Sequence, residues 1–87
     1  MAYHTNGSIA SGGTAQNALA EGHNFQSVVF QNVSDEDMTV AVNATAAAGT
    51  SGEVVYSESS AVFTNLNGKK LSVVSATTGK KYVIREA

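Results

Sequence analysis

Short apolar runs alternate with short polar runs along the chain. In residues 25–33, Phe and Val fall on both faces of a period-two pattern, as in a strand covered at least in part on both sides. Residues 38–44 alternate strictly, so Met38, Val40 and Val42 are expected to face a core. Residues 14–22 fit a helical turn or a strand, and the strand is the preferred interpretation. Further strands are predicted over residues 53–59, 60–66, 69–76 and 80–87.

Turn-forming residues separate these runs about every 10–12 residues, which is typical of a small sandwich or barrel. Asn67 and Gly68 form the strongest signal, a type I′ turn in which both residues take positive φ. Residues 34–37 have the length and polarity of a hairpin tip between two strands. The sequence therefore predicts an all-β fold, a small antiparallel β-sandwich or barrel of about seven short strands, with residues 14–87 as a single domain.

The first thirteen residues are polar and rich in Gly, Ser and Asn. Gly12 and Gly13 would act as a swivel at the end of this segment. Residues 1–13 are therefore predicted to be an extended, flexible N-terminal arm. Two interpretations stay open, a frayed terminus and an arm that becomes ordered on a neighbouring protein.

Composition limits how much core this chain of 87 residues can build. It has no Trp and no Cys, and most of its apolar residues are small. A domain of this size buries only about 60–65% of its extended surface. We therefore expect an isolated monomer to be marginally stable and to gain burial against copies of itself or a larger partner. The lack of Cys also excludes disulfides and thiolate metal sites within the chain.

The formal net charge of −2 provides no strong field for nucleic acid or an anionic membrane. No apolar run reaches transmembrane length. The first residues lack the basic and apolar regions of a secretory signal, so synthesis in a cytoplasm is expected.

Three adjacent acids, Asp35, Glu36 and Asp37, raise the possibility of a metal or catalytic site. A calcium loop needs ligands at alternating positions, a sharp glycine turn and a closing Glu, and none of these is present. The remaining interpretations are a solvated tip and an acidic contact for a basic partner. His4 and His23 lack the companion ligands of a zinc site. No nucleophile elbow or phosphate loop occurs, so we expect no enzyme activity and no cofactor.

The basic residues occur in two groups towards the end of the chain. If the last two strands are neighbours, their charges share one face of the sheet. This face would either protect an edge from unwanted pairing or contact an acidic protein surface. The residues concerned are Lys69, Lys70, Lys80, Lys81 and Arg85.

Three segments in order carry a family resemblance: Gly-Gly-Thr-Ala-Gln at residues 12–16, QN-x-S-D-x-x-M at 31–38, and SV-x-x-ATTG-x-KY at 72–82. With the residues between them, they resemble small virion structural proteins of tailed bacteriophages. The resemblance covers about 70 residues. It implies a small β-rich module of the capsid or of the head–tail apparatus, without enzyme activity.

The resemblance and the composition together lead to the expected function, a decoration or cement protein on the virion capsid surface, forming a homotrimer. Its partner would be the major capsid protein or another virion protein, with neither nucleic acid nor membrane bound. One alternative is a head fibre base or a head–tail or tail adaptor component. Another is a glycan-binding module, whose aromatic candidates are Tyr3, Tyr56 and Tyr82. The expected protein-contact residues are Tyr3, His4, Asp35, Glu36, Asp37, Lys69, Lys70, Lys80 and Lys81.

Overall fold

The computed structural model describes residues 4–48 and 50–87, and this part of the chain contains strands and no helix. Tyr3 lies outside the described residues. The strands are β1 (His4–Ser8), β2 (Gln16–Leu19), β3 (Val28–Asn32), β4 (Met38–Val42), β5 (Glu53–Val55), β6 (Ser60–Phe63), β7 (Leu71–Val74) and β8 (Lys81–Glu86).

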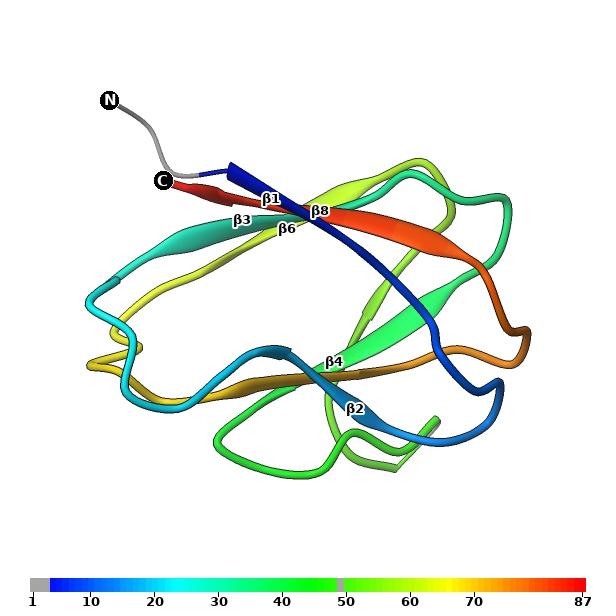
Figure 1. Cartoon of the computed structure of the whole chain (residues 1–87), viewed down its shortest axis with the longest axis horizontal. Coiled ribbons are helices and arrows are strands. Elements are labelled where there is room, and N and C mark those ends of the chain that lie inside the picture. The colour runs from blue at the N-terminus through cyan, green and yellow to red at the C-terminus, as the bar shows by residue number, and fades with distance from the viewer. Residues whose placement is uncertain (1–3, 49) are drawn as a thin grey trace.

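These strands form two antiparallel four-stranded sheets that face each other (Figure 1). Sheet A has the order β1-β8-β3-β6 and sheet B the order β2-β7-β4-β5. Every connection crosses from one sheet to the other except the one between β4 and β5. Eight strands with this crossing pattern make a jelly roll, which is a β-sandwich. The predicted all-β sandwich is confirmed, with eight strands in place of about seven.

The hairpin predicted through residues 34–37 is wrong, because β3 belongs to sheet A and β4 to sheet B. Four extended residues reach about 13 Å, and packed sheets lie about 10 Å apart. A polar segment long enough for a hairpin tip is therefore also long enough to cross the sandwich. Instead, β3 pairs with β6 and β8.

The turn at Asn67 and Gly68 has the predicted conformation, with φ of 50° and 79°. Lys69 N donates to Leu66 O at 2.9 Å and closes the turn. The strands on either side, β6 and β7, nevertheless lie in different sheets. The local conformation was readable from the sequence, whereas the pairing that it was expected to create does not form.

The N-terminal segment belongs to the sandwich from residue 4 onward. Residues 4–8 form β1, which pairs with β8 from His4 opposite Arg85 to Ser8 opposite Lys81. Gly12 is no swivel, since a Cβ there would lie 2.4 Å from the Ala76 carbonyl oxygen. Over residues 4–13, the flexible arm expected for residues 1–13 is replaced by an edge strand and a tightly packed corner, and residues 1–3 lie outside the described part of the chain. The alternation signal was weak here because this strand contains no large apolar residue.

The core lies between the two sheets and contains side chains from β2 to β8. Phe30 and Tyr82 stack within it, with ring centroids 5.1 Å apart. Met38 and Val40 are buried as predicted, whereas Val42 is 36% exposed because β4 ends there. The buried cluster comprises Ile9, Leu19, Val28, Phe30, Met38, Val40, Val55, Phe63, Leu66, Leu71, Val73, Tyr82 and Ile84.

The outer faces of the two sheets differ. The connection between β4 and β5 folds over sheet B, where Ala46 packs against Ala41 and Val74. Ser72 Oγ holds this connection through Ala46 N at 2.8 Å and Ala44 O at 2.6 Å. On the outer side of sheet A, Val62 on β6 and Val33 just after β3 are exposed.

Candidate functional site

The acidic run lies at one end of the sandwich and begins at a buried amide. The Asn32 side chain is fully buried at the end of β3. Its Nδ2 donates to Glu36 O at 2.8 Å and to Val55 O at 3.0 Å. Its Oδ1 accepts from Ser34 N at 3.0 Å and from Ser34 Oγ at 2.7 Å. One amide therefore fixes the path of the crossing segment and joins it to β5 of the opposite sheet.

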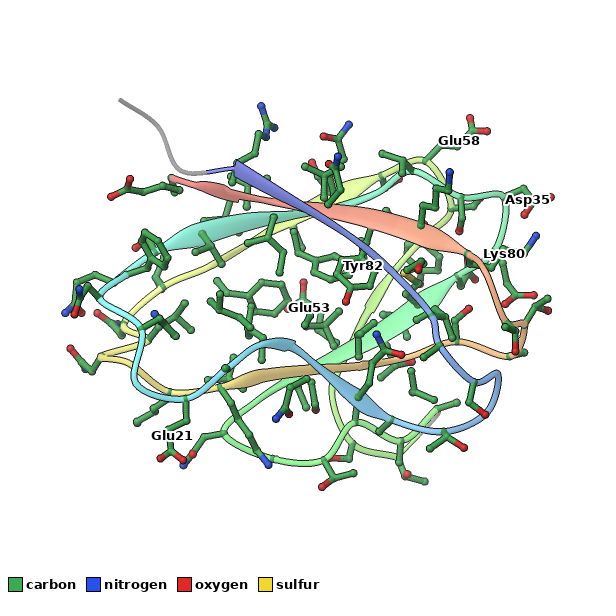
Figure 2. The ribbon with its side chains drawn as sticks, viewed as in Figure 1. Glu21, Asp35, Glu53, Glu58, Lys80 and Tyr82 are labelled. Carbon is green, nitrogen blue, oxygen red and sulfur yellow. The ribbon has the colours of Figure 1, made fainter. Side chains whose placement is uncertain are left out.

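Asp35 and Asp37 point to different neighbours. Asp35 Oδ1 pairs with Lys80 Nζ at 2.6 Å, and Figure 2 places the two residues at the same end of the molecule. Asp37 Oδ1 accepts from Ser57 N at 2.9 Å. The two carboxylates therefore connect the crossing segment to two separate loops.

Glu36 makes the largest set of contacts in this run. Its Oε1 accepts from Ser75 Oγ at 2.5 Å and from Thr77 N at 3.0 Å, and its Oε2 accepts from Thr77 Oγ1 at 2.8 Å. These bonds connect the segment after β3 to the segment after β7. Both carboxylate oxygens are thus occupied by the chain itself.

The electrostatics agree with a structural use of these carboxylates. The Lys80 ammonium, through its hydrogen bond and its charge, lowers the pKa of Asp35. Hydrogen bonds from Ser75 and Thr77 lower the pKa of Glu36. The bond to Asp35 raises the pKa of Lys80. All three groups are held in the charged form, so none is tuned to exchange a proton near neutral pH.

Within residues 4–48 and 50–87, no three His, Asp or Glu side chains are grouped so that they could hold a metal ion. Asp35 and Glu36 bind residues of the connection between β7 and β8, whereas Asp37 binds the connection between β5 and β6. The arrangement joins the crossing segments at one end of the sandwich. No helix in that part of the chain is long and apolar enough to span a bilayer.

The two lysine groups do not share a face, contrary to the sequence expectation. Lys69 and Lys70 precede β7, while Lys80 follows the turn beyond the other end of that strand, beside Asp35. The reason is that β7 and β8 belong to different sheets. Lys69 O contacts His23 Nε2 at 2.7 Å. Lys81 is exposed and pairs in register with Ser8 on β1.

Of the tyrosines that the structure describes, only Tyr56 is exposed enough to contribute to the aromatic platform of a glycan-binding module. Tyr82 is 4% exposed and lies between the sheets (Figure 2). Its hydroxyl is 3.3 Å from the Gln16 Nε2 donor. Tyr56, by contrast, is 64% exposed beyond β5. Burial of Tyr82 removes one of the three expected aromatic contacts.

The contact predictions missed the exposed valines on the outer face of sheet A. Val62 is 58% exposed on β6, and Val33 is 45% exposed just after β3. A shallow groove of about 440 Å³ runs from Val33 to β1 and β8. Residues lining it on the outer side are Asn6, Ser8, Val33, Lys81 and Val83. The two-residue period in residues 25–33 had already placed Val29 and Val33 on one apolar face, and this pattern was the sequence signal for the exposed surface.

Comparison with protein-family models found no match, and comparison with curated protein sequences found none either. Among solved structures, the fold is similar to a chain from Bacillus endospore appendages, which form a novel family of disulfide-linked pili. The TM-score is 0.60 at 17% sequence identity, and the match covers 100% of this chain and 85% of that one.

At this identity the likeness shows a shared small β fold. One chemical difference is certain from the sequence, because this chain contains no cysteine. Disulfides, which link those pili, cannot form between copies of this chain.

Proposed function

We propose that this chain is a non-enzymatic structural protein of a tailed-phage virion, a decoration or cement protein that stabilises the head shell. The observation that carries the proposal is the outer face of sheet A. Val62 and Val33 are exposed there, whereas part of the matching face of sheet B, at Ala41 and Val74, is covered by the chain's own connection. An apolar sheet face of this kind is typical of a surface that a partner covers. The family resemblance of the sequence supports the phage assignment.

The partner would be the major capsid protein or another virion protein, met at the capsid surface. The role is mechanical, since burial across joints between capsid subunits opposes the pressure of packaged DNA. A homotrimer would add avidity to weak individual contacts. Of the expected contact residues, Lys81 lines the groove on sheet A and is the best placed. Lys69 and Lys70 at the opposite end would form a separate contact, as would Tyr3 and His4 near the chain start.

The test is cosedimentation with phage heads assembled without this protein. We expect the natural chain to bind, and we expect Val33→Lys to weaken binding at least tenfold, since a buried charge would replace an apolar contact. The matched control is Val54→Lys, which changes a valine of similar exposure (39%) on β5 of the other sheet. Absence of binding by the natural chain, or equal loss in both variants, would contradict the proposal.

A second candidate is a fibre subunit, favoured by the likeness to the endospore pilus chain over the whole of this sequence. Without cysteines, such a fibre would be held by non-covalent contacts. A head fibre base or a tail adaptor is the related phage role. Copy number separates these roles, because a decoration protein covers the shell and an adaptor occurs at one vertex.

A further inference from the structure

The four sheet edges are protected to different degrees. On sheet B, the register of β2 shifts between Asn17 and Leu19, and β5 has only three residues, beginning with Glu53. Bulges, short strands and charges are the usual defences against edge-to-edge pairing. On sheet A, β1 and β6 pair without a register shift. Neither strand contains Lys, Arg, Asp, Glu or Pro.

We propose that β6 of one copy pairs antiparallel with β1 of a second copy, so that sheet A continues from copy to copy. This inference deepens the proposed structural role and rests on it for its biological use. The partner is a second copy of this chain. Strand direction, backbone register and the dimensions of the molecule favour that partner.

Strand direction allows the pairing by simple translation. Each neighbour in the order β1-β8-β3-β6 is antiparallel to the next. The two edge strands therefore run in opposite directions. A copy shifted along the sheet brings its β1 beside β6 in the antiparallel sense and preserves the alternation.

The backbone groups of β6 are directed for this contact. Asn32 N donates to Ser59 O at 2.8 Å, which marks a hydrogen-bonded pair in the ladder with β3. Because such pairs alternate in an antiparallel ladder, Ser60 and Val62 turn their N–H and C=O groups toward the free edge. Their side chains lie on the outer face, opposite Gln31 and Val29.

The same reasoning applies to β1. Ile9 N donates to Lys80 O at 2.8 Å, so the alternation directs the backbone groups of Asn6 and Ser8 away from β8. Ser8 O already accepts from Gln16 Nε2 at 2.8 Å, so the groups directed toward a second copy are both backbone groups of Asn6 and the N–H of Ser8. Asn6 and Ser8 are small and uncharged, as are Ser60 and Val62. A junction between β6 and β1 would therefore bring no like charges together and would cover Val62.

The dimensions also fit. Figure 1 looks along the direction in which the strands of sheet A are stacked, which is the shortest axis of the molecule. That axis measures 18 Å between Cα atoms. Four strands at the usual spacing advance roughly 19 Å per copy. The repeat expected for sheet A therefore matches the extent of one molecule along this direction.

The contact joins two different surfaces of the chain and is therefore heterologous, so the number of copies in the assembly depends on whether the ring of copies closes. Rotation between copies that closes after three gives the homotrimer, and rotation that does not close gives a filament. Both forms contain the same junction between β6 and β1. The experiments below therefore measure the junction and not the number of copies.

The first experiment uses proline at the free edge. In Val62→Pro the lost N–H faces away from β3, a position where an edge strand tolerates proline. We expect at least a tenfold weaker self-association by sedimentation, with β-sheet circular dichroism unchanged. The matched control is Val62→Thr, which keeps the N–H and the branched shape and should associate like the natural chain. Equal association of natural chain and proline variant, or a natural chain that stays monomeric at high concentration, would overturn the proposal.

The second experiment does not depend on how the proline variant folds. Because the chain has no cysteine, Val62→Cys and Asn6→Cys each introduce a unique thiol. The two variants, with different tags, are mixed and treated with a short thiol-specific cross-linker. We expect the mixed product to dominate over either homodimer. Dominance of the Val62→Cys homodimer would indicate pairing of β6 with itself and overturn the proposal, as would the absence of cross-links.

This test separates the inference from the proposed function. Failure of the cross-link with continued binding to phage heads would overturn the inference alone. A mixed cross-link from a protein that does not bind heads would overturn the phage assignment alone.

Discussion

Gly7 on β1 lies directly over the ring of Tyr82 on β8, its partner in the ladder. A Cβ at position 7 would be 2.4 Å from Cζ of that ring. The ring is buried and stacks on Phe30, so it cannot move aside freely. Glycine weakens an isolated strand, but here it allows the largest side chain of β8 to fill the core beneath an edge strand.

Gly7→Ala should therefore destabilise the protein. We expect a loss of about 1–3 kcal/mol in the free energy of unfolding, since overpacking forces the ring or the strand to shift. Chemical denaturation of the purified protein measures it. Ser8→Ala, at the next and exposed position of the same strand, is the control and should change stability by about 0.5 kcal/mol or less. Equal stability of the glycine and alanine proteins would show that β1 does not seal the core over Tyr82.

Asn32 provides a second test, because one buried amide joins two crossing segments. Asn32→Ala would leave Ser34 N, Val55 O and Glu36 O to find other partners. An unsatisfied buried group costs about 1–3 kcal/mol, so we expect a loss of about 2–5 kcal/mol in unfolding free energy by denaturant titration. Gln31→Ala, on the outward face of the same strand, should cost much less. A small effect at position 32 would mean that water or rearrangement replaces the amide.

Glu36 should make stability depend on acid pH. Its pKa in the folded chain lies below the ordinary value of 4.5, because Ser75 and Thr77 donate to it. The unfolded chain therefore takes up a proton first as pH falls. The stabilisation is complete above the ordinary value and is lost as pH falls through the lowered folded pKa.

Glu36→Gln should flatten this acid limb when unfolding free energy is measured from about pH 6 down to about pH 2. Part of the slope will remain, since the pKa of Asp35 is lowered as well. Glu21→Gln, at an exposed position, is the control and should keep the natural slope. An unchanged slope in Glu36→Gln would contradict the assigned hydrogen bonds.

The strands could be predicted from the sequence, because the two-residue alternation that marks a strand involves only neighbouring residues. Met38 and Val40 face the core for this reason, and the positive φ at Asn67 follows from the identities of two neighbouring residues. Pairing was not readable, because most ladders of a jelly roll join distant strands. Ser8 pairs with Lys81, and Val28 with Phe63. Short polar connections suit a hairpin and a crossing between sheets equally well, so they do not indicate which strands pair.

The candidate site shows the same limit. The acidic run was visible, but Thr77, which binds Glu36, lies 41 residues away. No local pattern indicates that partner. The apolar outer face of β3 was visible too, through Val29 and Val33. Whether it is covered depends on the connection after β4, which folds over the other sheet.

Tyr82 should determine the response to alkaline pH. Burial raises its pKa above the ordinary value of 10.0, although the hydrogen bond from Gln16 acts in the opposite direction. As pH rises, the unfolded chain loses the phenolic proton first, so this contribution to stability is complete below the ordinary pKa and is lost above it.

The variant Tyr82→Phe tests this, because its ring cannot ionise. It should be about 0.5–1.5 kcal/mol less stable at neutral pH, through the lost hydrogen bond, and the gap should narrow as pH rises. The exposed Tyr56 provides the control, since Tyr56→Phe should follow the natural protein throughout. The measurement is the unfolding free energy of each protein from neutral to alkaline pH, with phenolate absorbance recorded alongside. Parallel curves for the natural protein and Tyr82→Phe would mean that the ring ionises as easily in the folded chain, and hence that β1 does not keep water from it.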